Sequence, residues 1–315
     1  MHKKLLVLAL ASLGPALAQA HGFAGQRFFP ATLATDDPFV ADELSLPTVS
    51  ITRSNASGED PGGSQTTVSF DFAKRITQNL GFEVGVGHDR LRPSGQPKVS
   101  GWENTELGLK YNFYRNDAAE ALMSAGVTWE IGGSGSSAVA ERFSTWTPTF
   151  YFGKGFGDAQ SEWLRPFAVT GTAGVGFPSR SSSTTSSMDP DTGLVTSDTE
   201  RHPHVLQLGF ALQYSIPYLQ SAVKDQGIGA PWNRMIPVVE VALQKPMDRV
   251  DDRSWTGTIN PGVLWAGRQV QFGLEAVLPI NHASGRGVGL LAQVHFFLDD
   301  ILPDTFGKPL IGASR

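Results

Sequence analysis

Apolar and polar side chains alternate along two long stretches near the C-terminal end of the chain. The apolar positions recur at every second residue from Val270 to Ile280 and again from Val288 to Leu298. A side-chain period of two is typical of a β-strand with one apolar face. Each stretch is as long as the roughly 9–11 residues that a tilted membrane-spanning strand needs. We therefore expect a hairpin of two transmembrane strands.

The same alternation recurs along most of the chain. Besides the C-terminal hairpin, the expected strands cover residues 47–54, 66–75, 81–91, 102–114, 121–132, 144–156, 163–177, 204–216, 235–245 and 255–266. Their connections alternate between polar loops and mostly tight turns, as in outer-membrane barrels. The expected fold is all-β, a single antiparallel up-and-down transmembrane β-barrel of about twelve strands. The weak first strand and the long connection 217–234 leave ten or fourteen strands as alternatives.

The tryptophans give an independent indication of where the strands end. Their amphipathic rings concentrate at the two interfaces of a membrane barrel. The girdle candidates lie at the loop ends of the strands (Trp102, Trp129, Trp146 and Trp255) or at the turn ends (Trp163 and Trp265). A soluble β-sandwich, the main alternative fold, predicts shorter strands and gives no reason for connection lengths to alternate.

Composition narrows the class of protein further. The chain has 315 residues, a formal net charge of −5 and no cysteine. The absence of cysteine excludes disulfides, thiolate metal sites and thiol nucleophiles. The modest negative charge gives no reason to expect nucleic acid as a partner. No stretch beyond the N-terminus approaches the roughly 18 uninterrupted apolar residues of a membrane helix.

Four segments are expected from the pattern. Residues 1–20 resemble a secretory signal peptide, with a basic start, a short apolar core and small residues at the cleavage position. Residues 21–46 fit neither strand nor helix and are expected to form a periplasmic arm or a plug inside the barrel. The barrel then occupies 47–298, and a C-terminal tail occupies 299–315.

In each strand the residues that alternate with the apolar ones point to the opposite face of the sheet. We expect these residues to line the lumen. Its charged candidates are Asp71, Glu83, Glu106, Lys110, Glu130, Glu240, Glu275 and His295, so the lining is polar and net acidic. Such a lining selects cations or positively charged solutes if the pore is open. In a narrow interior the same charges pair across the bore and nearly close it. The sequence leaves both open, because the outcome depends on whether the 21–46 arm folds inward.

Residues with catalytic or metal-binding potential are sparse. Ser284 follows His282 by two residues in a loop, but the chain has no G-x-S-x-G nucleophile elbow. His202 and His204 could contribute to a metal site, yet histidines in a polar loop are more often simply solvated. We therefore expect no enzyme, no metal and no cofactor, with a hydrolase as the weakest alternative.

The whole mature chain resembles a Gram-negative outer-membrane β-barrel. More narrowly, Ser215-Ile-Pro-Tyr and Ile236-Pro-Val-Val-Glu are similar to the barrels grouped as MetA-pathway phenol-degradation proteins. The resemblance implies an outer-membrane location and transport, with the lipid bilayer and a small solute as partners and no catalytic motif to carry over. The tail beyond Leu298 departs from barrels that finish on an aromatic residue.

We expect a channel or transporter for small solutes with an acidic lumen. The alternative is a closed anchoring barrel whose extracellular loops bind a partner.

Overall fold

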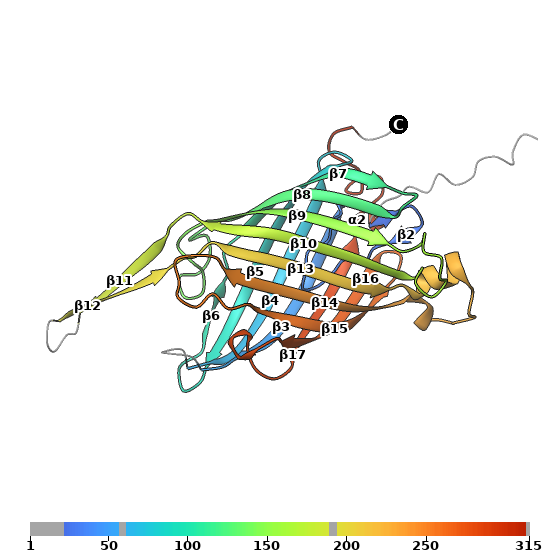
Figure 1. The fold of residues 1–315 in the computed structure, drawn as a ribbon. Helices are drawn as coiled ribbons and strands as arrows, with labels where there is room; N and C mark the ends of the chain where they lie inside the picture. The colour runs from blue at the N-terminus through green and yellow to red at the C-terminus, as the bar shows by residue number, and fades with distance from the viewer. Residues whose placement is uncertain (1–21, 57–60, 189–193, 313–315) are drawn as a thin grey trace, which may run out of the picture.

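Twelve antiparallel strands close into one barrel in the computed structural model, which describes residues 22–56, 61–188 and 194–312. Pairing runs from each strand to the next along the chain, and β3 closes the ring against β17 (Figure 1). The barrel strands are β3 (Glu43–Ser54), β4 (Gly63–Arg75), β5 (Leu80–Pro93), β7 (Glu106–Asn116), β8 (Ala121–Glu130), β9 (Thr145–Gly155), β10 (Phe167–Pro178), β13 (Val205–Tyr214), β14 (Met235–Pro246), β15 (Thr256–Ala266), β16 (Val270–Pro279) and β17 (Gly289–Phe297). The expected fold class and strand number are confirmed.

The shorter elements lie at the two ends of the barrel. The N-terminal arm holds β1 (Phe23–Ala24) and β2 (Arg27–Phe28), and β6 (Val99–Trp102) pairs with the end of β5 beyond β7. The remaining elements are β11 (Ser182–Met188), β12 (Val195–Arg201), α1 (Ile216–Tyr218), the π-helical turn Leu219–Val223, the 3-10 turns Trp232–Arg234 and His282–Ser284, and α2 (Leu298–Ile301). We call the end where β3 starts and β17 finishes the turn end, and the opposite end the loop end.

The outer surface of the barrel is apolar because alternate side chains of every strand point outward. Exposed large side chains include Leu109 and Phe113 on β7, Phe210 on β13 and Phe272 and Leu274 on β16. An exposed apolar band around a closed barrel is typical of a lipid-facing surface. No helix in the described part of the chain is long and apolar enough to cross a membrane.

Several boundaries differ from the expected ones. The strand expected at 102–114 starts at Glu106, because Trp102 belongs to the separate strand β6. The first strand starts at Glu43 rather than Pro47, and the β3–β4 register shifts between Ser45 and Thr48. A bulge of this kind accommodates Pro47. Because proline has no backbone N–H to donate, the sequence pattern placed the start of the strand at this residue. The loop expected at 178–203 contains the β11–β12 hairpin, which projects from the loop end (Figure 1). Lastly, β10 starts at Phe167, so Trp163 lies in the preceding connection and not on a strand. The signal peptide expected over residues 1–20 lies outside the described residues.

Candidate functional site: the lumen and its plug

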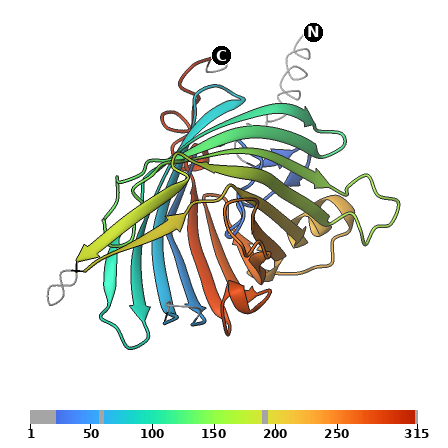
Figure 2. The same cartoon turned by 60° about the vertical axis from the view of Figure 1, so that its left-hand side comes forward.

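The N-terminal arm, residues 22–42, lies inside the barrel rather than below it (Figure 2). The side chain of Glu240, fully buried on β14, accepts hydrogen bonds from three successive arm amides. The N–H groups of Leu33, Ala34 and Thr35 lie 2.7, 2.9 and 2.8 Å from its carboxylate oxygens, and the Thr35 hydroxyl lies at 2.9 Å. Backbone amides that converge in this way form a strong anion site. Glu240 therefore holds the middle of the arm against the wall.

Opposite strands hold the same arm from the other side. Lys110 on β7 donates to the Asp36 carboxylate at 2.9 Å and to the Asp37 carbonyl at 3.0 Å. Its ammonium also lies 2.9 Å from the Glu83 carboxylate on β5. Gln271 on β16 donates to the Ala31 carbonyl at 2.7 Å. Because these partners come from around the ring, the arm spans the bore and does not lie along one strand.

At the turn end the arm is fixed by one buried arginine. Arg27 forms an ion pair with Glu120 at 3.2 Å and donates to the Pro166 carbonyl at 2.9 Å. The ring of Tyr218 lies 3.5 Å from the guanidinium carbon, and its hydroxyl donates to Glu120 at 2.7 Å. Burial, followed by the Glu120 carboxylate, raises the pKa of Tyr218 to about 12. The tyrosine therefore keeps its proton and its hydrogen bond over the physiological range.

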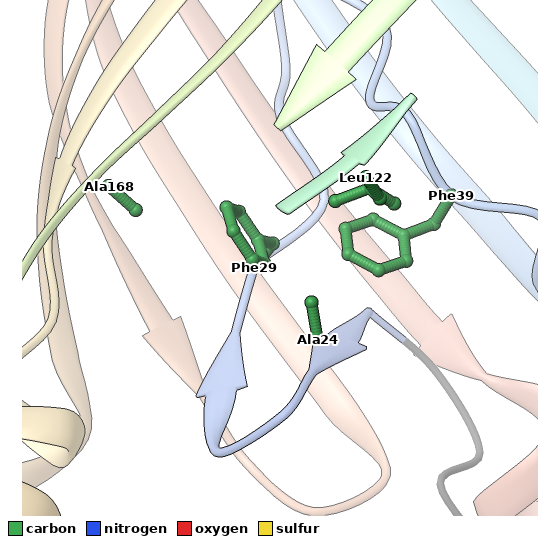
Figure 3. Close-up of a cluster of buried hydrophobic side chains, with 5 residues drawn as sticks. All are labelled: Ala24, Phe29, Phe39, Leu122 and Ala168. Atoms are coloured by element: carbon green, nitrogen blue, oxygen red, sulfur yellow. The ribbon is translucent and has the colours of Figure 1, made fainter. Parts of the chain in front are cut away.

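Apolar side chains fill the space between these polar contacts. Phe29 and Phe39 of the arm pack at 5.4 Å between ring centroids. They form a buried cluster with Ala24, with Leu122 on β8 and with Ala168 on β10 (Figure 3). Leu122 and Ala168 point into the lumen, where a water-filled pore would have polar residues. Their apolar character is explained by the arm that covers them.

The C-terminal tail folds back onto the same end. Asp42, fully buried where the arm enters β3, accepts hydrogen bonds from Lys74 at 2.9 Å and from the Arg75 side chain at 2.9 Å. Lys74 also donates to the carbonyls of Phe306 and Lys308, both at 2.7 Å. The arm, strand β4 and the tail are thus joined by one buried network.

A cavity of about 820 Å³ occupies the lumen beside the arm. Its lining includes residues 31–37, 39 and 41 of the arm. The cavity extends from Glu43 and Ala73 near the turn end to Thr145, Thr256 and Ser284 at the loop end. The lumen candidates that line it are Asp71, Glu83, Glu106, Lys110, Glu130 and His295. The other two, Glu240 and Glu275, are buried beside the arm and do not line the cavity.

The strand register places three of these carboxylates on one ring of cross-strand neighbours. Asp71 on β4 is paired with Gly85, Gly85 with Glu106 on β7, and Glu106 with Glu130 on β8. A β-carbon at Gly85 would lie 2.9 Å from the Asp71 carboxylate, so the glycine leaves the space in which that side chain lies. Neighbours on one ring are about 4.5–5.5 Å apart at their β-carbons. The acidic groups are therefore concentrated on one wall.

The other candidates are placed as follows. His295 hydrogen-bonds with Ser45 at 2.9 Å and faces Glu43 at 3.6 Å. Trp102, Trp129, Trp146 and Trp255 lie at the loop end, with Trp129 and Trp146 stacked at 5.0 Å, and Trp163 and Trp265 lie towards the turn end. The Ser284 hydroxyl donates to Asn281 at 2.8 Å and accepts the Gly257 N–H at 2.9 Å. Ser284 is thus part of the loop's own hydrogen bonding.

Sequence reasoning missed the residues that hold the plug, namely Arg27, Asp36, Asp42, Glu120 and Tyr218. Their partners are far away in sequence, and only the charged residues inside an otherwise apolar arm hinted at them. In the part of the chain that the structure describes, no group of three or more His, Asp or Glu side chains is arranged to hold a metal ion.

The fold is similar to solved outer-membrane barrels. An outer membrane channel from Pseudomonas putida F1 superposes with a TM-score of 0.58 at 11% identity, over 86% of this chain and 99% of that one. The KdgM porin gives 0.43 at 12% identity and the NanC porin 0.46 at 9%, each over 80% of this chain and 98% of the other. At these identities the first likeness shows the fold alone, and the two porin scores are too low to add to it.

No protein-family model matches the chain. No curated protein matches it by sequence.

Proposed function

We propose that this protein is an outer-membrane channel for small solutes, with a lumen that favours cations and an N-terminal arm that closes it. The observation that carries the proposal is the cavity of about 820 Å³, which is lined by the arm and by strand residues and reaches Thr145, Thr256 and Ser284 at the loop end. A barrel that serves only as an anchor needs no such chamber. In this proposal the loop end faces the outside of the cell and the turn end faces the periplasm.

The character of the lining supports a preference for cations. Asp71 and Glu106 are exposed although they lie within the bore, so they contact the water of the cavity. A ring of carboxylates at a constriction raises the local cation concentration. Among the described residues that line the cavity, Lys110 is the one lysine or arginine, and Asp36 and Glu83 already neutralise it. The similarity of Ser215-Ile-Pro-Tyr and Ile236-Pro-Val-Val-Glu to the MetA-pathway group fits a transport role at the outer membrane.

Conductance of the folded, full-length protein in a planar bilayer tests this proposal. With a KCl gradient across the membrane, the reversal potential should show a preference for K⁺ over Cl⁻. The paired change Asp71→Asn and Glu106→Gln should reduce that preference, whereas Asp251→Asn, which removes one charge from an exposed outer loop, should not. Openings with no ion preference in the native protein would refute the cation-selective lumen.

The closed anchoring barrel is the second candidate, and two observations favour it. The arm is held by hydrogen bonds and ion pairs from around the ring, while the β11–β12 hairpin projects far from the loop end (Figure 1). A silent bilayer from folded protein, together with loss of partner binding on deletion of residues 181–202, would support this function instead. We propose no catalytic role, because the Ser284 hydroxyl is engaged within its own loop.

A further inference from the structure

The acidic wall of the cavity is not neutralised by the protein. Asp71, Glu106 and Glu130 follow one another on a single ring, separated only by Gly85. In the described part of the chain no ion pair joins any of the three to a lysine or arginine. Glu130 accepts one hydrogen bond from the Asn104 amide at 2.9 Å, and this donor is itself uncharged. Like charges opposite one another on neighbouring strands destabilise a sheet unless a counter-charge is supplied.

The wall across the bore has a different chemistry. The acidic ring belongs to β4, β7 and β8, and the strand order places β13, β14 and β15 on the other side of the barrel. Those strands contribute Gln207, Gln244 and Thr256 to the cavity. These side chains are uncharged and can both donate and accept hydrogen bonds. One wall therefore attracts positive charge, while the other suits hydroxyl groups.

A third observation is an acceptor in the wall of the cavity without a donor in the described part of the chain. Gln293 on β17 lines the cavity and is 8% exposed. Its amide nitrogen donates to Thr48 at 3.0 Å, but its amide oxygen has no hydrogen-bond partner among the described residues. Gln293 is paired with Thr48, and Thr48 with Ser69, one inward position nearer the loop end than Asp71. A buried acceptor without a donor costs free energy unless a ligand or water supplies one.

We infer that this cavity is a binding site for a small organic cation that carries hydroxyl groups, of the amino-sugar class. Protonated amines bind to Asp71, Glu106 and Glu130, and the hydroxyls bind to the glutamine and threonine side chains of the opposite wall. The volume of about 820 Å³ lies within the range of pockets that enclose an organic molecule of two or three rings. The inference rests on the proposed channel function, because it takes the cavity as the path of the solute. Binding of the solute itself requires no conduction.

Calorimetric titration of the detergent-folded, full-length protein at about neutral pH tests the inference with three probes. The first is the chitosan disaccharide, which has two glucosamine units. The second is its di-N-acetylated form, which keeps the hydroxyls but loses the amine charges. The third is spermidine, which keeps the charge but has no hydroxyls. We expect the chitosan disaccharide to bind about tenfold or more tightly than either comparison compound. Equal affinity of the acetylated form, or equal affinity of spermidine, would overturn the assignment to amino sugars.

Variants then locate the binding site. Glu106→Gln should weaken binding of the chitosan disaccharide about tenfold, since it removes a charge-assisted hydrogen bond. Asp251→Asn, in an exposed outer loop, removes the same formal charge and should leave the affinity unchanged. The heat-modifiable shift on a denaturing gel establishes that each variant is folded. Unchanged affinity in folded Glu106→Gln protein would overturn the site.

The binding and conductance results separate the two proposals. Binding without conductance would keep the amino-sugar site and remove the channel. Conductance without binding of the chitosan disaccharide would keep the channel and remove the site.

Discussion

Thr35 and Glu240 are 205 residues apart in the sequence, yet two hydrogen bonds join them inside the barrel. The Thr35 N–H and hydroxyl both donate to one carboxylate oxygen, at 2.8 and 2.9 Å. The other oxygen of Glu240 accepts the Leu33 N–H. One strand residue thus fixes three consecutive positions of the arm, and in the proposed channel the closed state of the lumen depends on it.

Replacement of Glu240 by glutamine should therefore loosen the plug. The amide keeps the size of the side chain but loses the charge and one acceptor, and hydrogen bonds to a charged group contribute about 1.5–3 kcal/mol each. A loss of about 1.5–3 kcal/mol corresponds to a roughly 10- to 100-fold larger open fraction. Single-channel recording should show this as a higher open probability at unchanged unitary conductance. Glu162→Gln, at an exposed turn residue, is the matched control. Equal open probability in both variants would mean that Glu240 does not hold the arm closed.

The second prediction concerns Lys110, the counter-charge between the arm and the wall. Lys110→Gln leaves Glu83 inside the barrel without its partner at 2.9 Å. The Glu83 side chain is 33% exposed, so the charge that remains is half-buried and only partly solvated, which makes the loss of its partner costly. The midpoint of urea unfolding should fall, and the double variant Lys110→Gln with Glu83→Gln should recover part of the loss. Lys98→Gln, at an exposed loop position, is the control. A double variant less stable than the sum of the single changes would contradict the pairing.

The third prediction uses the absence of native cysteine, so that one introduced thiol reports on the arm alone. Ala24→Cys places the thiol in the fully buried apolar cluster, where a maleimide reagent should react slowly. Tyr218→Phe in this background removes the hydrogen bond to Glu120 and should speed labelling about fivefold, as expected for about 1 kcal/mol. Arg27→Met loses the ion pair with Glu120 and the hydrogen bond to the Pro166 carbonyl, and it should therefore speed labelling more than Tyr218→Phe does. Unchanged labelling in the Arg27→Met protein would show that this clamp does not hold the arm.

The barrel could be predicted from the sequence because its cause is local. An alternating side-chain pattern such as that from Val270 to Ile280 is fixed by the geometry of a single strand, and β16 (Val270–Pro279) follows it closely. The predicted strand boundaries were wrong where a local sequence signal had a second structural explanation. Pro47 marks a bulge within β3 and not the start of that strand. The Ser/Thr-rich stretch that the sequence pattern assigned to a loop forms the β11–β12 hairpin.

The arrangement of the site could not be predicted because it depends on register and on contacts between distant segments. The sequence shows that Asp71, Glu106 and Glu130 share the inward parity, but only the register places them on one ring. The alternation of side chains along the strand also assigned Glu240 to the lumen. It did not indicate that backbone N–H groups of the N-terminal arm cover this carboxylate. Whether an inward carboxylate faces water or the plug is decided by the path of an arm that has no periodic pattern of its own.

The last prediction is a pH dependence at the loop end. Glu103 lies between β6 and β7, and burial, followed by the nearby Asp89 carboxylate, raises the pKa of Glu103 to about 7. The folded state therefore holds this proton more tightly than the unfolded chain, in which a glutamate has a pKa of about 4.3. The stabilisation is complete below the unfolded value and is lost as the pH rises towards about 7.

Glu103→Gln is neutral at every pH and should remove this dependence. At about pH 8 the variant should unfold at a higher temperature than the native protein, since it no longer places a second charge beside Asp89. At about pH 5 the native side chain is mostly protonated, so the two midpoints should be similar. Heat-modifiability on denaturing gels measures both midpoints, with Asp251→Asn as a control for net charge. An equal difference between variant and native protein at both pH values would show that the Glu103 carboxyl is already ionised at the lower pH, contrary to its raised pKa.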